Sequence, residues 1–223
     1  MPAVVDWGTR EYRDALAAMH EMVRSRRAGR IEDTLIVVEH PPVVTVGVEG
    51  DDGGAVASGL PVVAVERGGH ATYHGPGQLV GYPIVDLEPR GRDVRRFVHD
   101  IEEIVIRAVG AFGVTAAHVP GRRGVWVEGA RKIASVGIAV DHWVSFHGFA
   151  LNVDPDLTAF ERFHPCGFDG TVMTSLAREA YRPLTVRDVK PEIVSAWEAV
   201  LGGHARSLPG ELDSAAPAAS LPS

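Results

Sequence analysis

The 223-residue sequence lacks the features that mark several large classes of protein. It has one cysteine, Cys166, so no intramolecular disulfide can form, which is typical of proteins in a reducing compartment. No stretch approaches 18 consecutive apolar residues. The N-terminal residues MPAVVDWGTREYRD also lack the charged and apolar regions of a signal peptide. These absences predict a cytoplasmic protein without a membrane span.

An excess of positive charge is also missing. The formal net charge is −7, and Lys and Arg occur only in short, interrupted runs such as RSRRAGR (24–30) and RGRDVRR (90–96). Nucleic-acid-binding faces are usually basic, so nucleic acid is not an expected ligand. Local basic patches can still bind an acidic protein. The candidates for such a patch are Arg24, Arg26, Arg27, Arg95 and Arg96.

The common metal and nucleotide motifs are absent as well. The sequence contains no CxxC, HExxH or GxxxxGK[ST], and RGGHATYHGPGQ does not match GxGxxG before a helix. His70 and His74 are four residues apart, a spacing that brings two imidazoles together on a helix. The four glycines and one proline of residues 67–77 argue against a helix there. No metal and no cofactor are therefore expected.

What is present predicts an α+β fold with a mixed sheet flanked by helices. Apolar spacing predicts helices over 9–28, 95–113, 171–180 and 185–203. β-Branched runs predict strands over 34–40, 43–48, 61–67 and 79–87, and a three-stranded meander over 124–128, 131–140 and 143–154. We expect a single domain over residues 1–203. Residues 204–223, rich in Ala, Pro and Ser, are expected to form a flexible tail.

The unusual stretch is RGGHATYHGPGQLVGYP, residues 67–83. It combines five glycines with two histidines and two tyrosines. Glycine permits positive φ and the close approach of another molecule, so the stretch is a candidate ligand wall lined with backbone N–H groups. A tight Gly-Pro corner between two strands is the alternative interpretation.

Two reactive side chains are candidates for catalysis. Cys166 lies between Pro165 and Gly167, so it is expected in a turn that can present its sulfur. A free thiol with a pKa of about 8.5 is mostly protonated at neutral pH, so catalysis requires a partner that stabilises the thiolate. Lys132 is the candidate partner. Strict alternation would place it on one face with Ala134, Val136, Ile138 and Val140. An inert buried cysteine and a strand-end lysine that reaches water are the alternatives.

Several segments together resemble the octanoyltransferase family of lipoate biosynthesis. They are EHPPVVTVG (39–47), RGGHATYHGPGQLVGYPIVDL (67–87), KIASVG (132–137), HGFALNV (147–153) and HPCGFDG (164–170). Two features depart from that family: Val44 stands where a larger, often aromatic residue is usual, and the C-terminal tail is extra.

The resemblance implies a fold related to the catalytic domain of lipoate and biotin protein ligases. It implies octanoyl transfer from octanoyl-acyl carrier protein, through a cysteine thioester, to a lysine of a lipoyl domain. The acceptors would be the lipoyl domains of 2-oxoacid dehydrogenase complexes and the glycine cleavage H protein. The catalytic residues would be Cys166 and Lys132. The implied substrate-binding residues are Arg67, Gly68, Gly69, His70, Ala71, Thr72, Tyr73, His74, Ser135, Val136, Gly137, Gly148, Phe149 and Ala150.

Two other functions remain open at this point. An ATP-dependent lipoate or biotin ligase could use the same scaffold through an acyl-adenylate and would need no cysteine. A non-catalytic module that binds an acyl group or a carrier protein would form no thioester. The combination of Lys132 and Cys166 favours the transferase over both. The protein is expected to act as a monomer.

Overall fold

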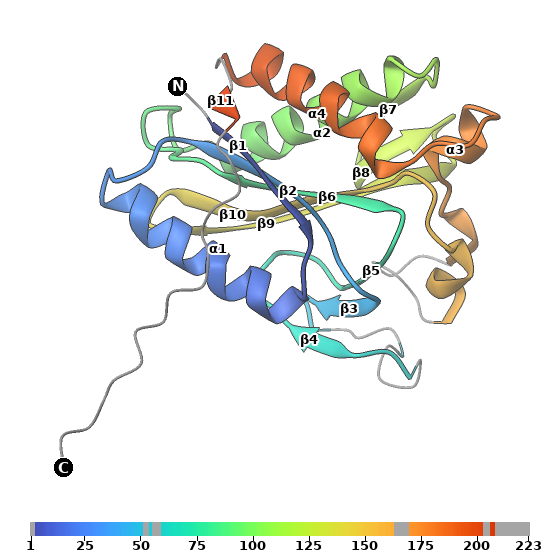
Figure 1. Ribbon diagram of the computed structural model, residues 1–223, viewed down its shortest axis with the longest axis horizontal. Coiled ribbons are helices and arrows are strands. Elements are labelled where there is room, and N and C mark those ends of the chain that lie inside the picture. The colour runs from blue at the N-terminus through green and yellow to red at the C-terminus, as the bar shows by residue number, and fades with distance from the viewer. Residues whose placement is uncertain (1–2, 51–53, 55–58, 163–169, 203–205, 208–223) are drawn as a thin grey trace.

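The computed structural model describes residues 3–50, 54, 59–162, 170–202 and 206–207. They form an α+β fold with two sheets (Figure 1). The larger sheet contains, in spatial order, β11 (Arg206–Ser207), β1 (Ala3–Thr9), β2 (Thr34–Glu39), β6 (Gln78–Ile84), β10 (Val144–Asn152), β9 (Arg131–Asp141), β8 (Arg122–Val127) and β7 (Ala116–Val119). The smaller sheet contains β4 (Val62–Ala64), β3 (Val43–Val46) and β5 (Ala71–His74).

The larger sheet is mixed, as the sequence predicts. β1 pairs in parallel with β2 and β11, whereas β2, β6, β10, β9, β8 and β7 pair antiparallel in that spatial order. The predicted meander is therefore confirmed as β8, β9 and β10. The smaller sheet pairs β3 in parallel with β4 and antiparallel with β5.

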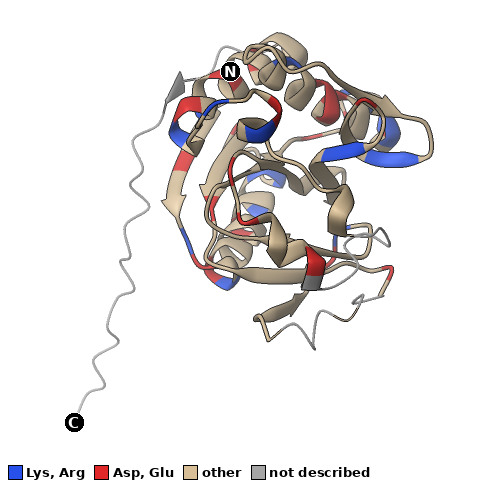
Figure 2. Ribbon diagram, turned by 90° about the vertical axis from the view of Figure 1, so that its right-hand side faces the viewer, with Lys and Arg blue, Asp and Glu red and all other residues tan. Residues whose placement is uncertain are grey.

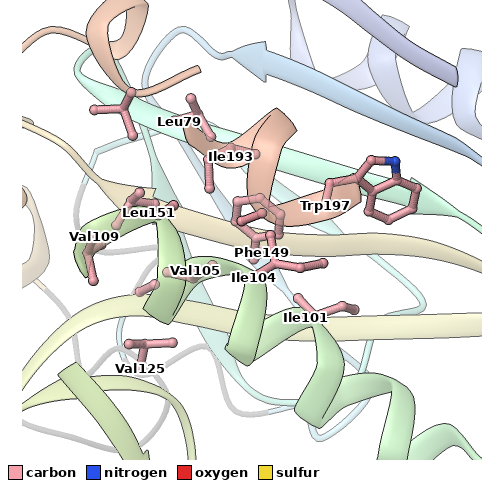
Figure 3. Close-up of a cluster of buried hydrophobic side chains, with 14 of the residues drawn as sticks. Leu79, Ile101, Ile104, Val105, Val109, Val125, Phe149, Leu151, Ile193 and Trp197 are labelled. Atoms are coloured by element: carbon pink, nitrogen blue, oxygen red, sulfur yellow. The ribbon is translucent and has the colours of Figure 1, made fainter. Parts of the chain in front are cut away.

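Helices cover both faces of the larger sheet (Figure 1). α2 (Val94–Gly110) and α4 (Val186–Leu201) lie on one face, and α1 (Tyr12–Arg27) lies on the other. The main core fills the space under α2 and α4, where Ile101, Ile104 and Trp197 meet Leu79 and Leu151 of the sheet (Figure 3). A second core lies under α1. The strand side chains divide between the two cores by simple alternation: Leu35 and Val37 face one, and Ile36 and Val38 the other.

Pro83 lies inside the central strand β6, where a proline removes one ladder hydrogen bond. Ser145 of the neighbouring strand β10 compensates for this loss. Its hydroxyl donates to the Pro83 carbonyl at 2.7 Å and accepts from the Val85 N–H at 3.0 Å. The ladder therefore continues past the proline to Ile84. The predicted extended run 79–87 is a strand as far as Ile84, and beyond it Asp86 forms an isolated bridge to Val144.

The prediction of one helix over 171–180 is wrong. The chain forms a short 3-10 turn, η4 (Gly170–Val172), and one turn of α-helix, α3 (Leu176–Glu179). Between them Met173 pairs with the backbone of Lys132, and the Thr174 N–H donates to the Lys132 carbonyl at 3.0 Å. These tertiary hydrogen bonds hold the segment extended despite its helical apolar spacing.

The sequence also missed four strands, β1, β5, β7 and β11. β1 was not predicted because its residues do not alternate between buried and exposed, and the helix predicted from residue 9 begins at Tyr12. β5 lies within the glycine-rich stretch, and β7 is a four-residue edge strand. Of the predicted tail, Arg206 and Ser207 pair with β1 as β11. For the remaining tail residues, which lie outside the described residues, flexibility stays a prediction.

Among the described residues, no helix is long and apolar enough to cross a membrane. A second 3-10 helix, η2 (Leu157–Arg162), precedes the undescribed residues 163–169. The main chain of η2 and that of η4 are in close contact, because a Cβ built on Gly170 would lie 2.2 Å from the Phe160 carbonyl oxygen. The two ends of the segment that contains Cys166 are therefore held together.

Candidate active site

A pocket of about 270 Å³ lies between the α1 side of the larger sheet and the glycine-rich stretch. Strands β6, β9 and β10 supply one wall, and the chain from Arg67 to His74 supplies another. Of the fourteen predicted substrate-binding residues, twelve line this pocket: Arg67, Gly68, Gly69, His70, Thr72, His74, Ser135, Val136, Gly137, Gly148, Phe149 and Ala150. Three segments far apart in the sequence therefore converge on one cavity.

Ala71 and Tyr73 do not line it. They alternate with Thr72 and His74 along β5, so they face the opposite side. Tyr73 packs edge-on against Phe160 with ring centroids 5.3 Å apart. Val44 belongs to the same small core, is fully buried and does not line the pocket.

Lys132 lines the same pocket, with only 2% of its surface exposed. The expectation that it shares a face with Ala134 is wrong, because β9 contains a bulge. Val125 of β8 pairs with Ala134, but Trp126, the next residue of β8, pairs with Lys132, which leaves Ile133 as an extra residue. A bulge reverses the alternation on one side of it. Ala134 therefore faces the main core, whereas Lys132 shares a face with Trp126.

Trp126 provides the local surroundings of the Lys132 amine. The Nζ atom lies 5.5 Å from the centroid of the fully buried indole ring, within the range of a cation–π interaction. The backbone of Lys132 is fixed by its bridge to Met173. The Lys132 backbone is thus fixed by β8 on one side and by the chain that follows residues 163–169 on the other.

Cys166 and its neighbour His164 lie outside the described residues. The distance between the Cys166 sulfur and the Lys132 amine is therefore not defined, and the catalytic pair stays a prediction. Met173, whose backbone pairs with Lys132, is seven residues along the chain from Cys166.

Neutral polar groups surround the floor of the pocket. Burial, reinforced by repulsion from His40, lowers the pKa of His74 to about 3. The neutral His74 ring donates from Nδ1 to the Gln78 side-chain oxygen at 2.7 Å. Its other face stacks on Tyr12 with ring centroids 5.8 Å apart. Burial raises the pKa of Tyr12. Because these groups are neutral, the floor of the pocket offers a ligand hydrogen bonds and apolar contacts.

The Arg67 guanidinium is a buried positive charge beside this neutral floor. Arg67 is 6% exposed and donates from Nη2 to the backbone oxygen of Thr45 at 2.7 Å and to its hydroxyl at 2.8 Å. Gly137 and Gly47 permit this packing. A Cβ on Gly137 would lie 3.2 Å from the Arg67 side chain, and one on Gly47 would lie 2.6 Å from the Arg67 carbonyl oxygen. The glycines of the predicted motifs thus allow segments to pack closely around an arginine.

Several pocket residues were missed by sequence reasoning. They are Tyr12, Glu49, Val80, Tyr82, Gly121, Arg122, Arg123 and His147. Val80, Tyr82 and His147 lie within quoted motifs, and this was the signal that could have identified them. No quoted motif contains the other five. Tyr12 begins α1, Glu49 follows β3, and Gly121, Arg122 and Arg123 lie in the turn before β8 and at its start. None of the five arginines proposed for protein docking lines the pocket. Among the described residues, no three His, Cys, Asp or Glu side chains form a metal-binding group.

The geometry can be compared with that of known proteins. Residues 11–198 match the model of the lipoyl protein ligase A/B catalytic domain. An octanoyltransferase of Geobacter sulfurreducens is 45% identical over 194 residues, which cover 87% of this chain and 82% of that protein. An octanoyltransferase of Rubrobacter xylanophilus is 44% identical over 204 residues, with 87% and 91% covered.

Solved structures agree on the fold. A lipoate-protein ligase A bound with ATP has a TM-score of 0.77 at 16% identity, covering 92% of this chain and 87% of that chain. A biotin protein ligase from Aquifex aeolicus has a TM-score of 0.52 at 9% identity, covering 91% and 69%. The chain therefore belongs to the lipoyl protein ligase A/B catalytic domain family. Within that family it is similar to octanoyltransferases, and it is an acyltransferase.

Proposed function

We propose that this protein transfers an octanoyl group from octanoyl-acyl carrier protein to a lysine of lipoyl domains, through a thioester on Cys166. The acceptors are lipoyl domains of 2-oxoacid dehydrogenase complexes and the glycine cleavage H protein. The observation that carries the proposal is the placement of Lys132. Its buried amine lines the pocket formed by the predicted substrate-binding segments, and its backbone pairs with the chain that leads from Cys166.

The first half-reaction forms the acyl-enzyme. The Cys166 thiolate attacks the carbonyl carbon of the thioester, a new carbon–sulfur bond forms, and the bond to the carrier's thiol breaks. A positively charged Lys132 favours the thiolate before the attack and gives a proton to the departing thiolate. Backbone N–H groups of the glycine-rich wall are suited to hold the oxyanion, which contributes about 3 kcal/mol per donor.

The second half-reaction forms the amide. Lys132, now neutral, accepts a proton from the acceptor's lysine amine while that amine attacks the acyl-enzyme. The carbon–sulfur bond breaks and Cys166 is released. An amide is more stable than a thioester, so neither ATP nor another cofactor is required. Val80 and Ala150 are the apolar side chains on the pocket side of β6 and β10 and would contact the acyl chain.

Intact-mass measurement tests the proposal. After mixing with octanoyl-acyl carrier protein and no acceptor, the wild-type chain should gain the mass of one octanoyl group. Cys166→Ala should gain none. Cys166→Ala that is still acylated would show that the nucleophile is assigned wrongly. If the wild-type protein binds the donor but its mass does not increase, the protein is a non-catalytic binding module.

A second assay separates the alternative of an ATP-dependent ligase. A lipoate-protein ligase with bound ATP has a similar fold to this chain, but an identity of 16% supports the fold alone. Wild-type protein given ATP, octanoic acid and a lipoyl domain should release no pyrophosphate. Pyrophosphate release together with acylation of the lipoyl domain would replace the transferase by the ligase.

A further inference from the structure

A buried carboxylate on the opposite face of the sheet contacts the strand next to Lys132. Glu102 lies on α2 and is 8% exposed. Its Oε1 atom accepts a hydrogen bond from the backbone N–H of Gly124 at 2.7 Å, and its Oε2 atom accepts one from His118 Nδ1 at 2.8 Å. Gly124 lies on β8 and His118 on β7, so one side chain bridges two strands.

The bridge lies where both ladders of β8 are irregular. The register between β7 and β8 shifts between Ala117 and Val119, and the register between β8 and β9 shifts at Val125 and Trp126. A buried backbone N–H without a partner is costly. At Gly124 the Glu102 carboxylate supplies that partner. Glu102 therefore stabilises the distortion that turns Lys132 toward the pocket.

Gly124 is in direct contact with the Lys132 side chain. Its φ is +103°, a conformation that suits glycine. A Cβ at this position would lie 2.8 Å from Lys132 Cε and 2.4 Å from the Ala134 carbonyl oxygen. The stem of Lys132 thus runs through the space that the missing side chain leaves, and the position of the Gly124 backbone decides whether that space exists.

We infer that Glu102 is a positioning residue for Lys132. It touches no part of the pocket, and it acts by holding Gly124 so that the lysine stem passes between β8 and the cavity. The inference deepens the proposed function, because its kinetic consequence rests on the role of Lys132 in transfer. Its structural consequence does not depend on that role.

The sequence allows a direct test, because it contains two lysines, Lys132 and Lys190. Lys190 pairs with Asp6, far along the chain from β8, and serves as an internal reference. Reductive methylation of the folded protein, read by peptide mass spectrometry, measures the labelling rate of each lysine. Glu102→Leu should raise labelling of Lys132 relative to Lys190 by roughly ten-fold, because local restraint is lost.

Three further variants make the test specific. Glu102→Gln keeps an oxygen for Gly124 and should label like wild type. Glu102→Asp withdraws the carboxylate by one methylene and should label like Glu102→Leu, which covers the case in which the leucine variant does not fold. Glu103→Gln is the matched control: Glu103 pairs with Arg107 and lies 3.9 Å from His118 Nε2, whereas the Gly124 N–H is bound by Glu102. It should change nothing.

The kinetic arm uses octanoyl-acyl carrier protein and a lipoyl domain. Glu102→Asp should lower kcat by up to ~10²-fold with little change in KM, because the amine is displaced from the reacting atoms. Unchanged relative labelling of Lys132 in Glu102→Asp would overturn the inference. Equal losses in Glu102→Gln and Glu102→Asp would also overturn it. Wild-type protein that transfers no octanoyl group would instead overturn the proposed function, and the labelling result would stand.

Discussion

The Lys132 side chain occupies the space that a side chain at position 124 would fill, so position 124 requires glycine. Gly124 combines a left-handed φ with a clash that a Cβ would make with the Ala134 backbone. Gly121, in the preceding turn, has φ of +77° and nothing within 4 Å of a built Cβ. An alanine at position 121 therefore adds only backbone strain, whereas an alanine at position 124 adds strain and a steric clash.

Gly124→Ala should be the more damaging of the two substitutions. Gly121→Ala should cost about 1 kcal/mol of unfolding free energy from strain alone. Gly124→Ala should cost at least ~2 kcal/mol more, since a backbone carbonyl cannot move aside as a side chain can. Urea denaturation of both variants measures the difference. Equal losses would mean that the Lys132 stem does not depend on this space.

At the scale of elements, a chain of buried hydrogen bonds joins the two walls of the pocket. Gln78 of β6 accepts from His74 and donates from Nε2 to the Asn152 side-chain oxygen at 2.9 Å. The Asn152 side chain on β10 then donates to the Thr174 carbonyl at 3.0 Å. The Thr174 N–H donates to the backbone carbonyl of Lys132. The glycine-rich wall, the central sheet and the chain that follows residues 163–169 are thereby fixed to one another.

Asn152→Leu should break this chain at its centre. The buried Thr174 carbonyl and one Gln78 N–H would lose their partner, which should cost about 2–4 kcal/mol of unfolding free energy. A double-mutant cycle with Gln78→Met, followed by urea denaturation, tests the connection. The double variant should lose less than the sum of the single variants, because they share a hydrogen bond. Strict additivity would show that the two side chains act independently.

At the scale of the whole molecule, the chain carries a net charge of −7, and few of its charged side chains are buried among the described residues. On the face shown in Figure 2, acidic and basic segments are interspersed. Inside, burial lowers the pKa of three histidines: to about 4 for His40, about 3 for His74 and about 4 for His147. All three are neutral in the folded protein at neutral pH.

These histidines should make the protein acid-sensitive. Their folded pKa values lie below the unfolded value of about 6.5, so the unfolded state binds more protons between about pH 4 and pH 6.5. Their stabilisation is complete above about pH 6.5 and decreases as the pH falls toward 4, by about 1.4 kcal/mol per pH unit for each histidine. Urea denaturation from pH 7 to pH 4.5 measures the slope.

His74→Gln provides the comparison for that slope. Glutamine does not titrate, so the variant should lose the contribution of one proton and show a shallower pH dependence. A variant as steep as wild type would mean that His74 is already protonated in the folded state or titrates alike in both states.

Local pattern was a good guide where each element is set by its own residues. The β-branched run of residues 34–40 predicts a strand, and β2 (Thr34–Glu39) confirms it. Glycine-rich and motif residues converge on one pocket as expected, because those positions need close backbone approach. The helix over 171–180 failed because backbone hydrogen bonds to Lys132, from another part of the chain, outweigh its apolar spacing.

The sequence by itself determined the α+β class, the meander and the family, because these follow from short-range patterns and motifs. It also indicated twelve of the residues that line the pocket. Tertiary structure decided the face that Lys132 occupies and the partners that hold it there. A one-residue bulge is invisible in a strand's composition, since it depends on how two strands pair. Glu102 was hidden for the same reason: a buried carboxylate on a helix has no meaning until the strand that it contacts is known.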